Sequence, residues 1–586
     1  MEPSSLSKEF CGLVWSTTVI VETVLVLLTL RTMLSMLSRR AAPSSSSLSS
    51  SSRRILFIAG AAFGTTTTYA ASTGTAGSVG AAKGRLVVTT WNIAAINNNP
   101  FEYWIDHPDP RYNTLMTGVE KFLSDDKQDV KVEDVFGQGK YEELEALMRK
   151  QPHIPAEAID EVRKSRWPQI KSRKIVSGFL KDAEIGKKRL ASMPDRLTNT
   201  ITVKTEVQAG AVTLLRPTPI NCFAGRFASV DDWWSQWKTF MFDTPLPNNS
   251  KKNVASLLKS IPRSKYPELT EEDEKLSLPL QIVSIAVFDA ILVHMLEQVG
   301  KDSWQDLRAE MCTALNSRKN DRVLEILSKT YGDSDVVCLQ EVGGAFAARA
   351  SQQLADFWVS TPSSAKALSR DQNSVLMLRK SEFPSPPVDV SSTIKIENAP
   401  VDDGDLLVVH ATHRDGSRYV IASFHGDTDG LATIPILRAV VQHAQAQGDG
   451  VKFVFGLDAN AYNKFKKGKQ LDVREFNKEF RALKLTSCFG NEIDPTNFTT
   501  FNARTFLQPQ LNKASGRTEF MEKGDVNPKD FILTFEQHGA FSETTKDNTG
   551  DRKYVEGMVF PTLRFPSDHG VLRSVLTFNN GDNCNA

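Results

Sequence analysis

Short apolar runs that end or begin in acidic, amide or imidazole side chains recur along this chain, mostly in its C-terminal half. Each run is rich in β-branched or aromatic residues, the pattern of a buried β-strand. The polar residues at the ends of the runs are Asn92, Gln340, Glu341, His425, Asp458, Asn460, Asp530, Asp568 and His569. An open sheet gathers residues at its strand ends into one crevice. The pattern therefore predicts an α/β fold with a single polar site.

The composition excludes some classes of protein. Hydrophobic residues make up 40% and charged residues 24% of the 586 residues, as in ordinary globular proteins, and the length predicts two or more structural units. A net charge of +1 argues against binding nucleic acid by bulk electrostatics, although it leaves room for a local basic groove. The 6 cysteines are scattered without a CxxC pair or zinc spacing, which predicts reduced thiols.

Residues 1–84 have a composition unlike the rest of the chain. No acidic residue occurs from Thr23 to Phe101, while arginine and serine are frequent, which is typical of a mitochondrial or plastid transit peptide. Val19–Leu30, when extended back to Leu13, approaches the length of a membrane span and favours a signal anchor, whereas Ile55–Phe63 suits the apolar part of a signal peptide. A disordered tail is the remaining alternative. We therefore expect an organellar protein, with a membrane-anchored or secretory location as the alternative.

Residues 97–315 lack the strand rhythm of the remaining chain and carry patterns typical of helices. Within them, Leu280–Val299 is strongly apolar but contains Asp289 and His294, so it predicts a buried helix rather than a membrane span. Strand-like runs resume near residue 316. We expect three parts: a targeting segment or possible membrane anchor with a disordered linker at 1–84, one domain formed by 85–96 and 316–580, and a large, mainly helical insertion at 97–315.

The motifs at the strand ends resemble those of a known superfamily. TWNI, LQEV, SFHG, GLDAN, KDFI and PSDHG, in this order, are similar to the six signature segments of the endonuclease/exonuclease/phosphatase (DNase I-like) superfamily. The resemblance covers Arg85–Ile96 and about Asn320–Thr577. It implies a four-layer α/β sandwich, in which helices flank two packed mixed β-sheets. It also implies a metal-dependent phosphoric ester hydrolase in which water attacks phosphorus directly.

The resemblance indicates which residues would bind the metal and which would orient the attacking water. It makes Glu341 the main ligand of Mg²⁺ or Mn²⁺, with Asn92 and Asp568 near the ion, and oxygen donors suit these cations. Asp458 and Asn460 are expected to orient the attacking water or to hold the phosphate. Because they are two residues apart, their side chains share one face if the segment stays extended. A turn that closes the strand is the alternative for this pair.

The resemblance also assigns the imidazoles. His569 is expected against the phosphorus, while Asp530 accepts its other ring proton and fixes the tautomer. His425 is expected to contact the phosphate as a second imidazole. Asn373 falls where relatives often have a substrate-contacting segment, and a turn is the alternative there.

Two departures narrow the chemistry that we expect. Ala94-Ala95-Ile96 follows Asn92 where many relatives place an acid or a glycine, and the tyrosine of apurinic-site enzymes has no clear match. Abasic-site chemistry is therefore disfavoured. The chain contains no GxSxG elbow, P-loop or HExxH motif that would support another catalytic system.

The predicted activity is that of a phosphodiesterase or nuclease acting on nucleic acid or a nucleotide. One alternative is a phospholipid or inositol-phosphate hydrolase that the apolar N-terminus brings to a membrane. The other is a catalytically inactive scaffold whose insertion binds a partner. The sequence does not specify the cleavage polarity or the oligomeric state.

Overall fold

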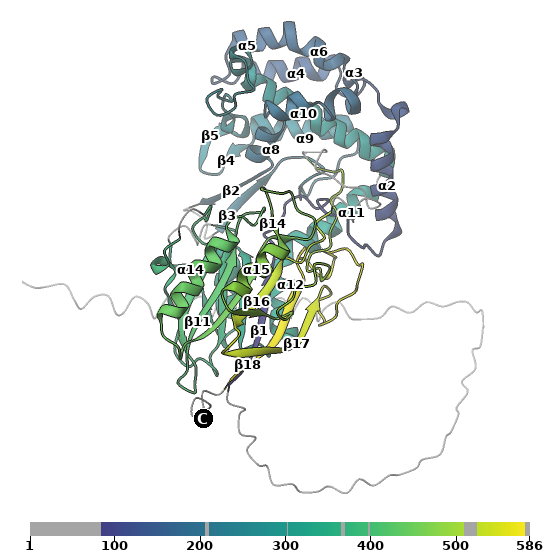
Figure 1. Ribbon diagram of the computed structural model, residues 1–586. Helices are drawn as coiled ribbons and strands as arrows, with labels where there is room; N and C mark the ends of the chain where they lie inside the picture. Colours follow the sequence, from purple (N-terminus) through teal and green to yellow (C-terminus); the bar gives the residue numbers. More distant parts are fainter. Residues whose placement is uncertain are drawn as a thin grey trace, which may run out of the picture. The chain divides into compact units, whose positions relative to one another are not determined.

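The computed structural model describes residues 84–205, 210–301, 303–364, 370–396, 399–508 and 524–579 (Figure 1). The segment 1–84, for which the sequence predicts targeting or membrane anchoring, lies outside the described residues except for Gly84. The predictions about location and membrane association therefore stay predictions.

Two six-stranded mixed sheets form the part of the chain that carries the motifs. The first has the strand order β17 (Gly539–Asp547), β18 (Val571–Phe578), β1 (Arg85–Asn92), β6 (Val336–Val342), β8 (Asn373–Arg379) and β7 (Phe357–Ser360). The second has the order β15 (Leu485–Ser487), β16 (Asp530–Phe535), β12 (Lys452–Asp458), β11 (Arg418–His425), β10 (Leu406–Thr412) and β9 (Val388–Asp389). Only the pairs β1–β6 and β11–β12 are parallel among the paired strands of these two sheets.

Alternating side chains build an apolar core on both faces of each sheet. In β6, Val336 and Cys338 point between the sheets, whereas Val337 and Leu339 point outward. The outward face of the first sheet is covered by α12 (Lys319–Glu325) and α13 (Gly344–Gln353). The outward face of the second is covered by α14 (Thr433–Ala446) and α15 (Val473–Ala482). This arrangement confirms the predicted α/β fold of two packed mixed sheets flanked by helices.

The two sheets approach each other closely beneath the strand ends. A Cβ atom added to Gly456 of β12 would lie 2.5 Å from Cys338 Cβ and 3.0 Å from Thr90 Oγ1. Beside this contact, the buried Gln340 Nε2 donates to Thr90 Oγ1 and to Ser423 Oγ, both at 3.1 Å. Because Ser423 belongs to the other sheet, these bonds fix the register of one sheet on the other.

Residues 97–315 contain most of the remaining helices. These are α2 (Pro110–Ser124), α3 (Val132–Val135), α4 (Gln138–Arg149), α5 (Ala156–Glu161), α6 (Trp167–Ser172), α7 (Ala183–Lys187), α8 (Ser192–Thr198), α9 (Val230–Lys238), α10 (Glu271–Gly300) and α11 (Ser303–Cys312). Two short hairpins, β2 (Thr200–Thr205) with β3 (Gly210–Leu215) and β4 (Pro245–Leu246) with β5 (Asn249–Asn253), interrupt them. The sequence pattern did not predict these hairpins, because a two-stranded ribbon buries too few residues to leave a clear alternation.

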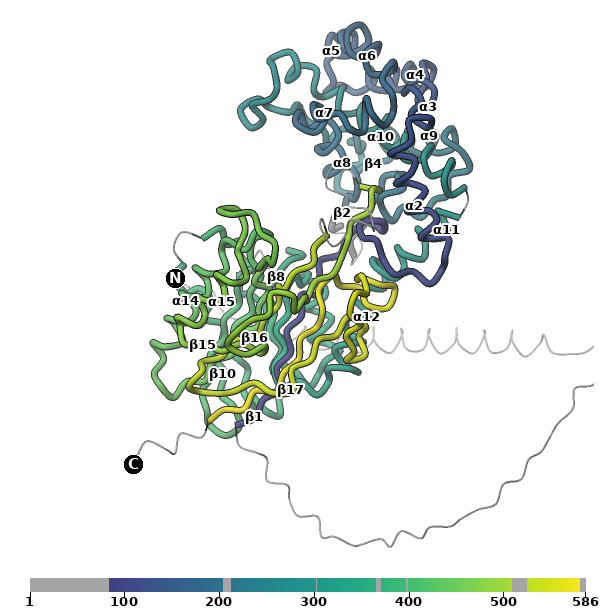
Figure 2. The backbone as a smooth tube through the Cα atoms, turned by 45° about the vertical axis from the view of Figure 1, so that its right-hand side comes forward, coloured from purple at the N-terminus to yellow at the C-terminus, as the bar shows by residue number. Residues whose placement is uncertain are grey.

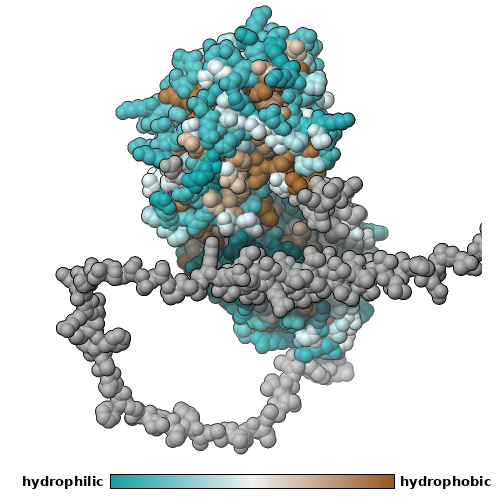
Figure 3. All heavy atoms as spheres, turned by 180° about the vertical axis from the view of Figure 1, so that it is seen from behind, coloured by the Kyte–Doolittle hydropathy of each residue, from teal (hydrophilic) through white to brown (hydrophobic). Residues whose placement is uncertain are grey.

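Helix α10 lies at the centre of this region. By length and composition it could cross a membrane, and it is the one such helix in the part of the chain that the structure describes. Its apolar window is nevertheless completely buried among the surrounding helices. The surface of this region, seen from behind in Figure 3, is correspondingly mostly hydrophilic. Within the core, Asp289 of α10 pairs with Arg216 at 2.8 Å and accepts a bond from Trp237 Nε1 at 3.0 Å. The ion pair satisfies two charges that would be costly to bury alone.

A loop of the sheet domain is built into the helical region. Trp104 N donates to Ala503 O at 2.9 Å, and Asn99 Nδ2 donates to Leu507 O at 2.8 Å. Ala503 and Leu507 also belong to the apolar cluster around α10. The loop reaches toward β2 and β4 in Figure 2. Residues 97–104 are thereby held next to the strand ends that carry the motifs.

We predict that Gly456→Ala lowers the free energy of unfolding by about 1–3 kcal/mol, because the added methyl group overpacks the contact with Cys338. Urea denaturation measures the change. Gly450→Ala is the matched control, since a Cβ atom there meets nothing within 4 Å. Equal unfolding midpoints for the two variants would contradict the close sheet contact.

Candidate active site

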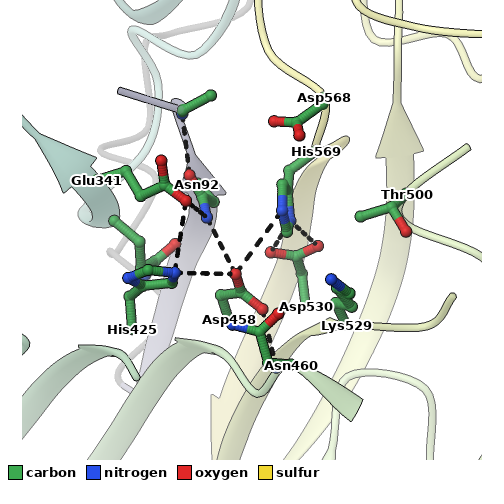
Figure 4. A network of polar contacts seen from close by, with 12 residues as sticks. Asn92, Glu341, His425, Asp458, Asn460, Thr500, Lys529, Asp530, Asp568 and His569 are labelled. Carbon is green, nitrogen blue, oxygen red and sulfur yellow. Dashed lines mark hydrogen bonds and ion pairs between the residues drawn. The ribbon is translucent and has the colours of Figure 1, made fainter. Parts of the chain in front are cut away.

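Strand direction brings the predicted site residues to one edge of the two sheets. Asn92 and Gln340 are paired at the carboxyl ends of the parallel strands β1 and β6, and His425 and Asp458 are paired at those of β11 and β12. Strand β16 runs antiparallel to β12, so its first residue, Asp530, pairs with Asp458. Strand β18 runs antiparallel to β1, which places Asp568 and His569, just before β18, at the same edge (Figure 4).

Glu341 leaves the regular strand path to face this edge. The β6–β8 register shifts between Leu339 and Val342, and Glu341 has a φ of 55°. Its Oε1 accepts from Asn92 Nδ2 at 3.0 Å, and its Oε2 accepts from Ala95 N at 2.8 Å. Burial alone would raise the pKa of Glu341, but the imidazole of His425 and these hydrogen bonds lower it to about 2. Glu341 is therefore ionised at neutral pH.

Asn92 connects the two carboxylates of the site. Its Nδ2 donates to Glu341 Oε1 and to Asp458 Oδ2, both at 3.0 Å, while its Oδ1 accepts from Ala94 N at 2.9 Å. The amide nitrogen therefore faces the carboxylates, and the amide oxygen is engaged by the backbone. Ala94 has a φ of 54°, so it adopts a glycine-like conformation.

The segment with Asp458 and Asn460 turns rather than staying extended. Strand β12 ends at Asp458, Asn460 has a φ of 46°, and Asn460 N donates to Asp458 Oδ1 at 2.9 Å. This is the turn that Asp and Asn favour. Both side chains nevertheless line the same cavity, so the turn replaces the extended backbone as the reason for their proximity.

His569 and Asp530 form a buried pair. His569 Nδ1 lies 3.1 and 3.0 Å from the two oxygens of Asp530, and Thr499 Oγ1 donates to Asp530 Oδ2 at 2.6 Å. Burial raises the pKa of Asp530, and the carboxylates of Asp530 and Asp458 raise the pKa of His569 although burial opposes this. The pair therefore keeps the imidazole of His569 protonated to higher pH than an ordinary histidine. His569 Nε2 lies 3.7 Å from Asp458 Oδ2.

His425 lies on the other side of Asp458. Its Nε2 is 3.4 Å from Glu341 Oε1 and 3.7 Å from Asp458 Oδ2. Figure 4 shows His425 and His569 approaching Asp458 from opposite directions. The two imidazoles thus flank one carboxylate inside the cavity.

Asn373 lies outside the cavity that these residues line. It is 3% exposed at the start of β8, and its Nδ2 donates to Val342 O at 3.0 Å and to Arg370 O at 3.3 Å. It holds two strand ends together, while Arg370, Asp371 and Gln372 before it line the cavity. Its predicted substrate contact stays a prediction.

The cavity has a volume of about 1040 Å³ and is lined by residues from both parts of the chain. The helical region supplies Asn97, Asn98, Asn99, Glu102, Tyr103, Asp195, Asn199, Ile220 and Leu315 to its wall. The sheet edge supplies Glu341, His425, Asp458, Asn460, Asp568 and His569. Residues 97–315 therefore shape the entrance to the polar edge of the sheets.

Sequence reasoning missed several polar residues of the cavity, among them Tyr103, Lys319 and Lys529. Tyr103 OH donates to Asp568 Oδ2 at 2.8 Å across 465 positions of the chain. Lys319 is the first residue of α12, and its position carries no motif. Lys529 could have been noticed, since it directly precedes Asp530 in the motif KDFI. Contacts of this kind follow from the tertiary fold, and a single sequence carries no sign of them.

The donor set of the cavity fits a hard divalent cation. Glu341, Asp458 and Asp568 offer carboxylate oxygens, which Mg²⁺ and Mn²⁺ prefer. Ligand atoms of Asp458, Asp530 and His569 also lie within 4.8 Å of one another. However, the hydrogen bond between His569 Nδ1 and Asp530 already uses ligand atoms of two of these three residues. The carboxylates of Glu341 and Asp458, linked by one amide, are therefore the better position for an ion.

Comparison with known families finds one match outside the sheets. Residues 129–309 match a domain of unknown function, DUF8234. This match covers most of the helical region and none of the strand-end residues. Among curated proteins, no significant relative was found.

Several solved structures match less than half of this chain. A humanized D. rerio TDP2 with 14 mutations is 13% identical, with a TM-score of 0.30, and covers 45% of this chain and 95% of that chain. The human Nocturnin catalytic domain with bound sulfate is 14% identical, with a TM-score of 0.30. The match covers 44% of this chain and 86% of the Nocturnin chain. An endonuclease/exonuclease/phosphatase family protein from Bacteroides thetaiotaomicron is 13% identical, with a TM-score of 0.30. The match covers 44% of this chain and 89% of the Bacteroides chain. At such scores, evidence for substrate and chemistry has to come from the geometry of the site.

We predict that Asp530→Asn lowers the pKa of His569, because the variant loses the carboxylate that favours the imidazolium while burial still disfavours it. The wild-type imidazole should stay protonated to higher pH than an ordinary histidine, and the variant should lose its proton at lower pH. Histidine-selective ¹⁵N NMR titration of metal-free protein measures both, with His569→Ala for assignment. An unchanged His569 titration in Asp530→Asn would contradict the pairing.

Proposed function

We propose that this protein is a divalent-metal-dependent phosphoric ester hydrolase, a phosphodiesterase or nuclease in which water attacks phosphorus directly. The observation that carries this proposal is the convergence of Glu341, Asp458 and the His569–Asp530 pair in one cavity. Two packed sheets and four separate strand ends contribute to it. Such an arrangement has no role in stabilising the fold, because it gathers carboxylates that repel one another.

The residues of the chain divide the chemistry among them. Because Asp530 holds Nδ1, Nε2 of His569, which lies 3.7 Å from Asp458 Oδ2, is the atom that exchanges a proton with water or donates to the phosphoryl group. Asp458 and Asn460 line the floor where a water would be oriented. His425, on the opposite side of Asp458, is placed to donate to the negative charge that develops on the phosphoryl oxygens.

A bound Mg²⁺ or Mn²⁺, held by Glu341 with Asp458 and Asp568 nearby, would neutralise phosphoryl charge as a Lewis acid. Asn92 would keep Glu341 and Asp458 in place through its amide nitrogen. No cysteine or serine nucleophile is needed for this reaction. The mechanism therefore requires no covalent intermediate on the protein.

The substrate class that we propose is a phosphodiester of a nucleic acid or a nucleotide. The residues of the LQEV and SDHG motifs resemble those of deadenylases and phosphodiesterases. This resemblance favours a nucleic acid or nucleotide substrate over phospholipids and inositol phosphates. A cavity of about 1040 Å³ accommodates a nucleotide-sized group beside the reacting phosphate.

The test is hydrolysis by the purified full-length chain, with Mg²⁺ or with EDTA. The panel contains single-stranded RNA and DNA, dinucleotides, sphingomyelin and inositol phosphates. We expect metal-dependent cleavage of one nucleic-acid or nucleotide substrate. In Glu341→Gln and His569→Ala, we expect kcat to fall by about 100-fold or more.

Two variants away from the cavity serve as controls. Glu475→Gln changes an exposed acid of α15, and His538→Ala changes a histidine that does not line the cavity. Both should keep wild-type rates. Cleavage of lipid or inositol phosphate alone would replace the proposed substrate class. No turnover of any ester by folded, metal-binding protein would instead favour the inactive scaffold.

A further inference from the structure

Lys319 places a buried amine inside the cavity. It is the first residue of α12 and is 3% exposed, and its side chain lines the cavity next to Glu341 and Asp568. Its Nζ lies 3.1 Å from Ala95 O. The amide of the same residue, Ala95 N, donates to Glu341 Oε2 at 2.8 Å. One residue of the loop after β1 therefore fixes both the lysine and the carboxylate at the centre of the site.

The other cations that line the cavity are paired with carboxylates. Arg370 lies 2.7 Å from Asp405, Arg504 lies 2.9 Å from Glu102, and Lys529 lies 2.8 Å from Asp525. Within the described ranges of the chain, no ion pair joins Lys319 Nζ to a carboxylate. Its charge is therefore the one that remains available to an anion in the cavity.

An ammonium group has three N–H donors, and the described part of the chain uses one of them on Ala95 O. Burying an ammonium without a carboxylate partner destabilises a protein. Burial lowers the pKa of Lys319 to about 8, against the attraction of Asp568 and Glu341. A structural role does not explain such a group, because a neutral side chain of similar length would be buried at lower cost.

We propose that Lys319 binds a nonbridging phosphoryl oxygen of the substrate, as a further substrate-binding residue of the site. This inference rests on the proposed function. A phosphoryl oxygen supplies the negative charge and the acceptor that the ammonium lacks, and charge-assisted bonds of this kind are short and strong. Because Lys319 begins the helix that follows residues 97–315, the contact also links this region to substrate binding.

The test uses full-length wild-type protein and Lys319→Met, with inorganic phosphate as the probe in the presence of Mg²⁺. Calorimetric titration should show phosphate affinity about 10- to 100-fold weaker in the variant, as expected for the loss of a charged hydrogen bond. Thermal unfolding without phosphate should show that Lys319→Met is at least as stable as wild type, because the buried charge is gone. Lys319→Arg should retain part of the affinity.

Arg318→Met is the matched control, since it removes the same charge from the neighbouring, exposed position outside this cavity. It should bind phosphate like wild type. Equal phosphate affinity in Lys319→Met and wild type, or a variant that loses affinity only because it unfolds at lower temperature, would overturn the inference.

The enzymatic assay separates this result from the fate of the proposed function. Hydrolysis by wild type with unchanged phosphate affinity in Lys319→Met removes the role of Lys319 and leaves the function standing. Lys319-dependent phosphate binding without hydrolysis of any ester supports the anion site and contradicts the function. A wild-type protein that neither binds phosphate nor hydrolyses an ester contradicts both.

Discussion

The site depends on the amide of Asn92, which holds carboxylates from two different sheets. Glu341 belongs to the sheet that contains β1 and β6, whereas Asp458 ends β12 of the other sheet, and both accept a bond from the same nitrogen. Two carboxylates this close repel each other unless a donor or a cation lies between them. The pair can therefore form only where the sheets pack in one register, which Gly456 and the bonds of Gln340 set.

The helical region is part of the site rather than an appendage. Tyr103 reaches Asp568, and the loop containing Ala503 packs into the core around α10. The cavity consequently has a floor made by strand ends and a wall made by residues 97–315. Any molecule that enters the cavity therefore meets both surfaces.

The sequence predicted much of the sheet edge and little of its surroundings. Short apolar runs located β1, β6, β12 and β16, and the directions of the paired strands explain why residues at their ends meet. A turn at Asn460 was one of the two alternatives that the sequence offered, whereas the backbone conformation of Ala94 was not predictable, because it depends on a hydrogen bond that the folded site offers. The role of Lys319 was not predictable either, because only the tertiary fold brings Lys319 to Ala95.

Cation binding tests the central claim most directly. Metal-free full-length protein would be titrated with Mn²⁺ while electron paramagnetic resonance follows the free ion. The account predicts uptake by wild type and by Glu475→Gln, an exposed acid outside the cavity, and strongly weakened uptake by Glu341→Gln. Absence of Mn²⁺ binding to folded wild type, or undiminished binding to Glu341→Gln, would contradict a metal site held by Glu341 and Asp458.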